Sequence, residues 1–477
     1  MGSFNYFLTP TELGDIKGVL RTTPAQVYAA SKNLLLAIEK VLGLEVGFQM
    51  PEDFLRYNSE IWNILPLVNN LYHEGIVTKF FSLPRQYPDE PPMMIYRAHT
   101  PKQEAMTVPG GTGFSTFSHT QACMSAIGEA FERYALLHFL PKKGACKDAP
   151  YKDVQPRALD IFSIAGISTK RRRREKYHDR TLYFDENSLF RWTKGYSITQ
   201  DKKVWVPLQM TTLAYTAPSK GSEPTILPLV STGAASHTNL KEAILAGLLE
   251  VIERDAFMIT WTNKLSPPLI DPGSIQDEKL QAILETLKRY HLDVSIISLP
   301  SDIPSHSILV LITDKTGVGP AVTVGGGSGF EVNKVILRAL HEALAVRIFT
   351  RKELDKKRKE KSALPDKKSL GHNERVLWWG SSLERVGDIS FLTQGEKRHV
   401  TEFQNYPSFS SSGDALEFLV QALHKNNTTE VFYSDISENI PYKKTGLHAV
   451  MVLAPGLQPM HLDESVPFLD GKRITEI

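Results

Sequence analysis

Two copies of the pattern Glu-x-x-Glu-Arg lie within apolar segments of the chain: EAFER at residues 129–133 and EVIER at residues 250–254. Carboxylates that converge in apolar surroundings repel one another strongly unless a cation lies between them. Magnesium prefers carboxylate, water and phosphate oxygens as ligands, and nearby arginines can bind phosphate oxygens bidentately. The repeated pattern is therefore consistent with a site for a magnesium-chelated nucleotide. The alternative is a solvated helix face with ordinary Glu–Arg pairs, and the spacing alone does not choose between the two.

Each copy falls on the polar face of a predicted amphipathic helix. At about 3.6 residues per turn, residues three, four, seven or eight positions apart share one arc of a helix. The face of the first helix carries Ser125, Glu129, Glu132 and Arg133, and that of the second carries Glu242, Glu250, Glu253 and Arg254. The apolar residues on the opposite faces, such as Cys123 and Ile252, are predicted to pack into the core.

A third predicted helix, within VILRALHEALAVR, carries Arg338, Glu342 and Arg347 and follows the glycine-rich segment GGGSG at residues 325–329. We expect this segment to be a turn, because a glycine-rich turn before a helix lets the backbone approach a phosphate closely. The segment matches neither GxGxxG nor the P-loop pattern, and the chain contains no Walker A sequence. Any nucleotide site is therefore predicted to be built from helix faces.

The composition excludes several classes of protein. The formal net charge is only +2 over 477 residues, which argues against a nucleic-acid-binding polycation. The two cysteines, Cys123 and Cys146, form no CxxC pair, so a zinc site or a thioredoxin-like motif finds no support. The N-terminus lacks the pattern of a signal peptide, and no apolar run is long enough to cross a bilayer. We expect a cytoplasmic protein that binds neither nucleic acid nor membrane.

The chain is predicted to contain a mostly helical N-terminal region, residues 1–89, and a larger domain, residues 90–477. An amphipathic helix is predicted at 23–43, and the proline-rich segment LPRQYPDEPPMM marks the boundary. In the larger domain, helical patterns alternate with five segments typical of strands, which predicts an α/β (α+β mixed) fold. The five segments are LDVSIISLP, HSILVLITD, VTEFQNY, TEVFYSDI and LHAVMVLAPG.

Two charged tracts interrupt this pattern: KRRRREK at residues 170–176 and RKELDKKRKEK at residues 351–361. We expect the first to be a solvated loop and the second a solvated helix end. The alternative for either tract is a docking patch for an acidic peptide or partner.

Longer motifs surround the three helices: GGTGFSTFSHTQACMSAIGEAFERY, STGAASHTNLKEAILAGLLEVIERDAF and GGGSGFEVNKVILRALHEALAVR, followed by VMVLAPGLQPMHLDE. In that order they resemble the YcaO family over most of the chain. The resemblance implies a YcaO-like catalytic domain that uses ATP and Mg²⁺ to activate a backbone amide of a peptide. The best-known members form thiazole and oxazole rings in ribosomally made peptides. The implied activity is therefore that of a cyclodehydratase that closes Cys, Ser or Thr residues into azolines.

The resemblance also implies roles for the residues at matching positions. The nucleotide and its metal would be bound by Gln121, Ser125, Glu129, Glu132, Arg133, Glu242, Glu250, Glu253, Arg254, Arg338, Glu342 and Arg347. Among these, the predicted magnesium ligands are Glu129, Glu132, Glu250, Glu253 and Glu342. The nucleophile belongs to the substrate, so no catalytic side chain of this chain is predicted.

The chain departs from the family pattern at three places. It has Gly111-Thr112-Gly113 where many members have Gly-Lys-Gly, Ala345 where many have Gln, and the ending FLDGKRITEI where azoline-forming members commonly have Pro-x-Pro-x-Pro. These departures leave two alternatives to azoline formation. One is a YcaO-type enzyme that forms thioamides or amidines, and the other is a docking scaffold without turnover.

The first 90 residues resemble neither a leader-peptide-binding module nor an E1-like domain. The predicted partners are therefore a ribosomally made precursor peptide and a separate E1-like or leader-binding protein. Related proteins often pair, so a homodimer is predicted by analogy.

Overall fold

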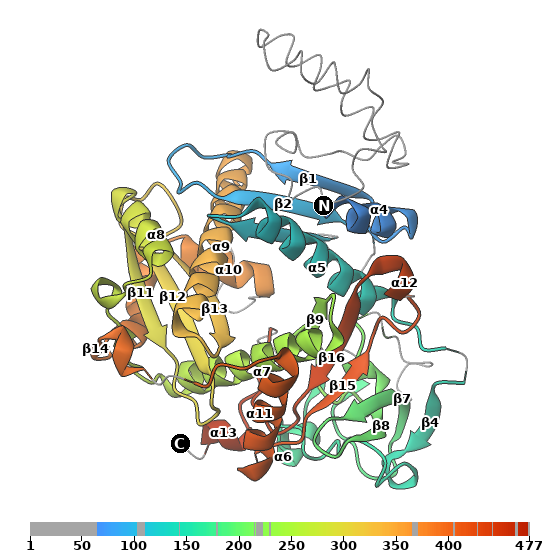
Figure 1. Cartoon of the computed structure of the whole chain (residues 1–477). Coiled ribbons are helices and arrows are strands. Elements are labelled where there is room, and N and C mark those ends of the chain that lie inside the picture. The colour runs from blue at the N-terminus through green and yellow to red at the C-terminus, as the bar shows by residue number, and fades with distance from the viewer. Residues whose placement is uncertain are drawn as a thin grey trace, which may run out of the picture.

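The computed structural model describes residues 64–475, apart from short gaps at 103–109, 143, 178–179, 214, 216–222, 229, 365–370, 404–405, 427, 441 and 463–465. The helix predicted at 23–43 and most of the predicted N-terminal region lie outside these residues. The described chain forms three main β-sheets with helices packed against them, so the predicted mixed α/β fold is confirmed (Figure 1). No helix in the described chain has the length and apolar character needed to cross a bilayer.

The first sheet is antiparallel and carries the helix with the first Glu-x-x-Glu-Arg copy. Its strands are β1 (Lys79–Leu83), β2 (Met94–His99) and β3 (Gly111–Ser115), and the helices beside it are α4 (Leu65–His73) and α5 (His119–His138). The Ser118 side chain caps α5 by accepting a hydrogen bond from the backbone N–H of Gln121 at 3.1 Å. β1 precedes the predicted boundary at residue 90 and pairs with β2 beyond it, so one sheet spans that boundary.

Small residues allow α5 to lie directly on β3. The buried face of α5 includes Ala122, Ala126 and Ala130, and Gly111 and Gly113 of β3 face it. A Cβ atom added at Gly113 would come within 1.9 Å of the carbonyl oxygen of Ala122. Glycine therefore permits a backbone-to-backbone contact at this position that a larger residue would prevent.

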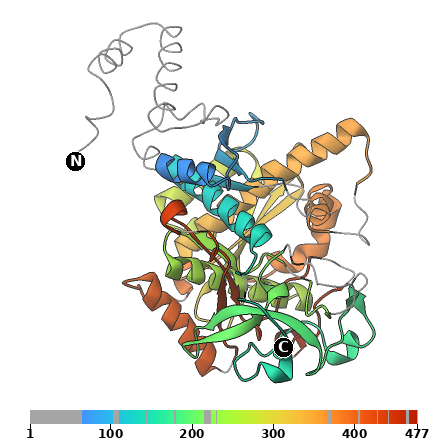
Figure 2. The ribbon, with the colours of Figure 1, turned by 90° about the vertical axis from the view of Figure 1, so that its right-hand side faces the viewer.

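The second sheet carries the third predicted helix. Its strands run in the order β13 (Val322–Gly329), β12 (His306–Asp314), β11 (Leu292–Ser298), β10 (Leu269–Ile270) and β14 (Lys397–Arg398). Its helices are α8 (Glu278–Arg289), α9 (Val332–Glu360) and α10 (His372–Gly380). β12 is buried along almost its whole length, as its apolar run requires. The last turns of α9 extend beyond the sheets (Figure 2).

The glycine-rich segment at 325–329 is the end of strand β13, so the prediction of a turn there is wrong. The strand keeps its pairing with β12 through residue 329. A Cβ atom added at Gly325 would lie 2.2 Å from the backbone nitrogen of Ala343 in α9. The glycines serve close packing of a strand on a helix, and the sequence does not distinguish this need from that of a turn.

The third sheet carries the helix with the second Glu-x-x-Glu-Arg copy. Its strands run in the order β4 (Lys147–Pro150), β7 (Leu189–Ser197), β15 (Phe432–Asp435), β16 (His448–Leu453) and β9 (Ala234–His237), and β8 (Lys202–Pro207) pairs with β7. The helices α7 (Leu240–Asn263) and α11 (Ser412–Lys425) pack beside it, and Asn239 caps α7. Smaller elements are α6 (Thr169–Arg172), β5 (Lys176–Tyr177), β6 (Arg180–Thr181), α12 (Tyr442–Thr445) and α13 (Lys472–Thr475).

Four of the five predicted strands are confirmed as β11, β12, β15 and β16. The fifth, VTEFQNY, is wrong, because residues Val400–Glu402 form a short 3₁₀ helix. His399 and Glu402 form a capping box at its start. The His399 ring accepts a hydrogen bond from the backbone N–H of Thr401, and the Glu402 carboxylate accepts one from the backbone N–H of His399. These local hydrogen bonds outweigh the strand propensity of Val and Thr.

The basic tract at 170–176 is only partly the solvated loop that was expected. Arg171 pairs with Glu175 at 2.8 Å and with Asp470 at 3.3 Å. Arg172 is buried and donates to backbone carbonyls, including that of Ile226 at 2.6 Å. These two arginines hold other segments of the chain and are not available to dock an acidic partner.

The second tract is the end of α9, as expected, and its outer residues are exposed. Its first residue is an exception: Arg351 is buried and binds Glu90 at 2.8 Å and Asp89 at 2.7 Å. The tract therefore also anchors the proline-rich connector to α9.

The contact between β3 and α5 gives a stability prediction. We expect Gly113→Ala to destabilise the protein by about 1–3 kcal/mol or more, because the added methyl group must push α5 away from the sheet. Gly387→Ala is the matched control, since an added Cβ there meets no atom within 4 Å. Urea unfolding of both variants provides the measurement, and equal midpoints would contradict the packing account.

Candidate functional site

A glutamate on each of α5, α7 and α9 is held by a backbone N–H from a neighbouring segment, which is a strand for α5 and α9 and the turn just before β9 for α7. In every case one carboxylate oxygen accepts the hydrogen bond, and the two residues are 16 or 17 positions apart in the chain. The donor–acceptor pairs are Thr112 with Glu129 (2.6 Å), Gly233 with Glu250 (3.1 Å) and Gly326 with Glu342 (2.6 Å). This repeated hydrogen bond sets the direction of three of the predicted metal ligands.

Two arginines neutralise the other oxygen of these carboxylates. Arg133 forms an ion pair with Glu129, four residues earlier on α5, and also donates to the carbonyl oxygen of Gly110 at 2.8 Å. Arg254 lies 3.6 Å from Glu250 and 2.6 Å from Glu253 on α7. Arg338 on α9 is exposed and forms no hydrogen bond or ion pair with another described residue. Its guanidinium is therefore available to a ligand.

Among the described residues, no backbone N–H donates to Glu132 or Glu253, and both glutamates have raised pKa values. Glu132 is half-buried and has no hydrogen-bond partner within the described chain. Burial raises its pKa well above the ordinary value, and the neighbouring carboxylates Glu250 and Glu129 raise it further. Glu253 is 7% exposed, and burial raises its pKa to about 7 although Arg254 opposes the shift.

These electrostatic effects cross between helices, so the three acidic faces converge. Glu250 of α7 acts on Glu132 of α5, and Glu342 of α9 acts on both Glu250 and Glu253. An added Cβ at Gly326 would meet the Glu253 carboxylate at 2.4 Å, which places β13 directly against the α7 face. In Figure 1, α5, α7 and α9 border the middle of the molecule.

Two hydrogen bonds outside the acidic cluster hold the helices in this arrangement. The Ser236 hydroxyl, in the strand before α7, donates to the carbonyl oxygen of Gly128 in α5 at 2.7 Å. Thr116, in the turn before α5, contacts the His341 ring of α9 through its hydroxyl at 2.8 Å. Burial lowers the pKa of His341 to about 4, so the ring is neutral at physiological pH.

Four of the predicted site residues lie outside this cluster of contacts. Gln121 and Ser125 lie on the exposed face of α5 nearer its start, where Gln121 accepts from the Ser115 hydroxyl at 3.1 Å. Glu242, in the first turn of α7, contacts His237 at 2.7 Å and accepts from Ser412 at 3.1 Å.

Arg347 is the fourth, and it lies within a buried ion-pair network. It contacts Glu90 and Asp314 at 2.6 Å each and donates to the carbonyl oxygen of Pro320 at 3.1 Å. All three guanidinium nitrogens therefore have protein acceptors. This placement argues against the predicted contact between Arg347 and a nucleotide.

The sequence-based reasoning missed the backbone N–H donors of Thr112, Gly233 and Gly326, along with Ser236 and His341. A usable signal exists for the first three. Each lies in or beside a glycine-containing segment, at a nearly constant distance in sequence before a glutamate on a helix. Ser236 and His341 have no such signal, because their partners are distant in the sequence.

Within the described chain, no three His, Cys, Asp or Glu side chains lie close enough to hold a metal ion by themselves. Magnesium usually retains waters and binds through one or two carboxylates together with substrate phosphates. Glu132 and Glu253 fit this requirement, because they carry raised pKa values and no backbone donor holds them. Glu129, Glu250 and Glu342 remain predicted ligands, with one oxygen each already bound to a backbone N–H.

Comparison with known proteins identifies a family and a fold. The family model described as YcaO cyclodehydratase, ATP- and Mg²⁺-binding, matches residues 114–458. An uncharacterized protein of Methanothermobacter thermautotrophicus is 23% identical over 383 residues, which cover 80% of this chain and 89% of that protein.

Two solved structures share the fold. A heterocyclase in complex with substrate and cofactor is 20% identical with a TM-score of 0.64, and the match covers 82% of this chain and 52% of the heterocyclase. This chain thus spans about half of that protein. The YcaO protein of Methanopyrus kandleri, bound with AMPPCP and Mg²⁺, is 18% identical with a TM-score of 0.57, covering 84% of this chain and 94% of that one.

The raised pKa of Glu253 predicts a pH dependence of stability. The unfolded chain loses this proton near pH 4.5 and the folded chain near pH 7, so the folded state holds the extra proton between these values. Stability should therefore fall as pH rises through this window and then level off. Glu253→Gln should remove about 1–3 kcal/mol of that fall, because glutamine has no proton to lose.

Urea unfolding at several pH values, without nucleotide, measures this effect. Glu285→Gln on the exposed face of α8 is the control and should keep the wild-type slope. The same slope in Glu253→Gln and in wild type would contradict the assignment.

Proposed function

The chain belongs to the YcaO family, and we propose that it uses ATP and Mg²⁺ to activate backbone amides of a ribosomally made peptide, closing Cys, Ser or Thr residues into azolines. The observation that carries the proposal is the convergence of acidic faces from α5, α7 and α9, each bordered by an arginine. The carboxylates of these faces repel one another, and bound cations would reduce that repulsion. A magnesium-chelated triphosphate supplies the cations, and its phosphates suit the arginines.

Each group of residues has a distinct task in this proposal. Glu132 and Glu253 would bind the magnesium ions, with Glu129, Glu250 and Glu342 completing the acidic site. Arg133, Arg254 and Arg338 would bind phosphate oxygens. When bound, the nucleotide supplies a phosphoryl group for the amide oxygen, which makes that oxygen a good leaving group. The protein's contribution is positioning and charge neutralisation.

The state of the cysteines agrees with a nucleophile that comes from the substrate. Cys123 is fully buried on the apolar face of α5, and burial raises its pKa to about 12. Burial also raises the pKa of Cys146. Both thiols are therefore protonated at physiological pH, and the two cysteines of the chain offer no reactive thiolate.

The departure from the family pattern at Thr112 is compatible with activity. At position 112 the backbone N–H, and not the side chain, holds Glu129, so threonine retains this contact. A docking scaffold would gain nothing from half-buried carboxylates with raised pKa values, and this cost favours an enzyme.

We further propose that a separate protein or domain delivers the precursor peptide. The matched heterocyclase chain is about twice as long as the part that this chain covers, and that protein was solved with substrate. An E1-like or leader-binding partner would fill this role. A homodimer remains a prediction by analogy.

Nucleotide binding tests the first part of the proposal. ATP with Mg²⁺ should raise the melting temperature of the wild-type protein, since a ligand of the folded state stabilises it. Glu132→Gln should weaken this binding by about tenfold or more, because it removes a carboxylate to which no group of the described chain donates a hydrogen bond. Thermal unfolding across an ATP–Mg²⁺ titration gives the affinity. Glu285→Gln should behave as wild type, and a Glu132→Gln protein with unchanged affinity would contradict the assignment.

Mass spectrometry tests the reaction. A precursor peptide incubated with the protein, its partner, ATP and Mg²⁺ should lose the mass of one water for each azoline formed. A gain that corresponds to exchange of oxygen for sulfur would identify a thioamide-forming enzyme. An unchanged peptide, with the partner present and ATP bound, would favour the scaffold.

A further inference from the structure

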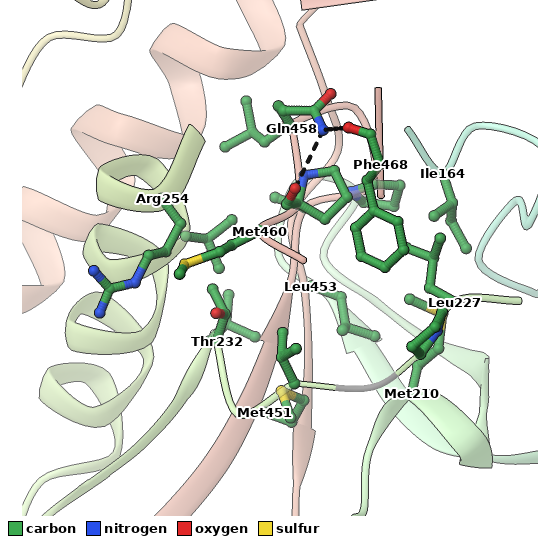
Figure 3. A pocket seen from close by; sticks show the side chains of 18 residues that line it. Ile164, Met210, Leu227, Thr232, Arg254, Met451, Leu453, Gln458, Met460 and Phe468 are labelled. Atoms are coloured by element: carbon green, nitrogen blue, oxygen red, sulfur yellow. Dashed lines mark hydrogen bonds between the residues drawn. The ribbon is translucent and has the colours of Figure 1, made fainter. Parts of the chain in front are cut away.

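An apolar pocket lies beside the acidic cluster, between α7 and the segment that follows β16. Its walls are almost entirely aliphatic, thioether and aromatic side chains. They include Met210, Leu227, Val230, Val251, Met460 and Phe468. Figure 3 shows Arg254, Thr232 and Met460 on one side of this pocket and Phe468, Ile164 and Leu227 on the other. An apolar cavity of this kind suits an apolar ligand group.

A buried carboxylate on α7 fixes one wall of the pocket. Asp255 is 0% exposed and accepts from the backbone N–H of Gln458 at 2.7 Å. Arg473 of α13 binds both oxygens of Asp255 at 2.7 Å each. The Gln458 side chain donates to the carbonyl oxygen of Phe468 at 2.7 Å. The segment after β16 is therefore tied to the helix that carries Glu250 and Glu253.

The basic tract fixes the opposite wall. Arg172 donates to the carbonyl oxygen of Ile226, next to Leu227, at 2.6 Å. Arg171 donates to the carbonyl oxygen of Pro467, next to Phe468, at 2.8 Å. These two arginines shape an apolar cavity, which explains why they are less exposed than the rest of the tract.

Two residues that line the pocket, Arg254 and Thr232, connect it with the acidic cluster. Arg254 lines the pocket and also contacts Glu250 and Glu253. Thr232 lines the pocket, and the next residue, Gly233, donates its N–H to Glu250. A group that occupies the pocket therefore lies beside Arg254, whose side chain contacts the carboxylates of Glu250 and Glu253.

We propose that this pocket binds an apolar side chain of the substrate peptide, of the size of Leu, Met or Phe, close in sequence to the amide that is activated. The inference rests on the proposed function, because it assumes that a peptide reaches the acidic cluster. The three methionines that line the pocket, Met210, Met451 and Met460, adapt to side chains of different shape. The pocket thereby selects which residue of a peptide is presented to the site.

Short fluorescent peptides with a central Cys test the proposal. The position before or after the Cys is varied among Leu, Phe, Gly and Asp, and binding to the full chain is measured by anisotropy with AMPPCP and Mg²⁺ present. At one of these positions, the Leu or Phe peptide should bind about tenfold or more tightly than the Gly peptide. Met460→Trp should remove this preference by filling the pocket. Leu227→Ala should enlarge the pocket and shift the preference toward Phe.

Val318→Trp is the matched control, because Val318 is 52% exposed in the turn between β12 and β13, away from the pocket. It should keep the wild-type preference, and ATP–Mg²⁺ should still raise the melting temperature of all three variants. Equal binding of the Leu, Phe and Gly peptides, or a preference unchanged in both pocket variants, overturns the inference. Loss of the ATP–Mg²⁺ response in wild type, with the side-chain preference retained, would instead overturn the proposed function.

Discussion

The structure depends on one repeated hydrogen bond, from the N–H of a strand residue, or of the residue just before a strand, to the carboxylate of a glutamate on the helix packed beside it. A hydrogen bond to a charged group contributes about 1.5–3 kcal/mol, so each pair is a substantial local restraint. The bond forms only where strand and helix approach closely, which requires glycines on the strand and small residues on the helix. The contacts of Gly113 with Ala122 and of Gly325 with Ala343 meet this requirement. The three sheets therefore direct three carboxylates without a dedicated loop.

This arrangement concentrates negative charge that the protein alone only partly neutralises. Arg133 and Arg254 pair with carboxylates on their own helices, but Glu132 has no hydrogen-bond partner among the described residues and Glu253 has a pKa of about 7. Such a site is less stable when empty than when a cation is bound. The strained electrostatics are thus compatible with tight binding of a metal-chelated phosphate, since the ligand removes repulsion that already exists.

Helix α7 connects this electrostatic site to the rest of the molecule through consecutive residues. Glu253 and Arg254 face the acidic cluster, whereas Asp255 is buried and anchors the segment after β16 through Gln458 and Arg473. The pocket proposed for a substrate side chain lies between the acidic cluster and the segment that Asp255 anchors. One helix thereby fixes both the charged groups and the apolar wall, and a shift of α7 would disturb the two together.

The sequence by itself determined the fold class, the helices that carry the glutamates and their polar faces. Helical periodicity and strand propensity are local properties, and α5, α7, α9, β11, β12, β15 and β16 follow them. Only the tertiary structure decided which glutamates meet. In the structure, Glu242 and Arg347 lie apart from the other predicted site residues. The glycines at 325–329 belong to a strand, and Arg172 of the basic tract is buried. These outcomes depend on contacts between residues far apart in the chain, whose geometry local patterns do not encode.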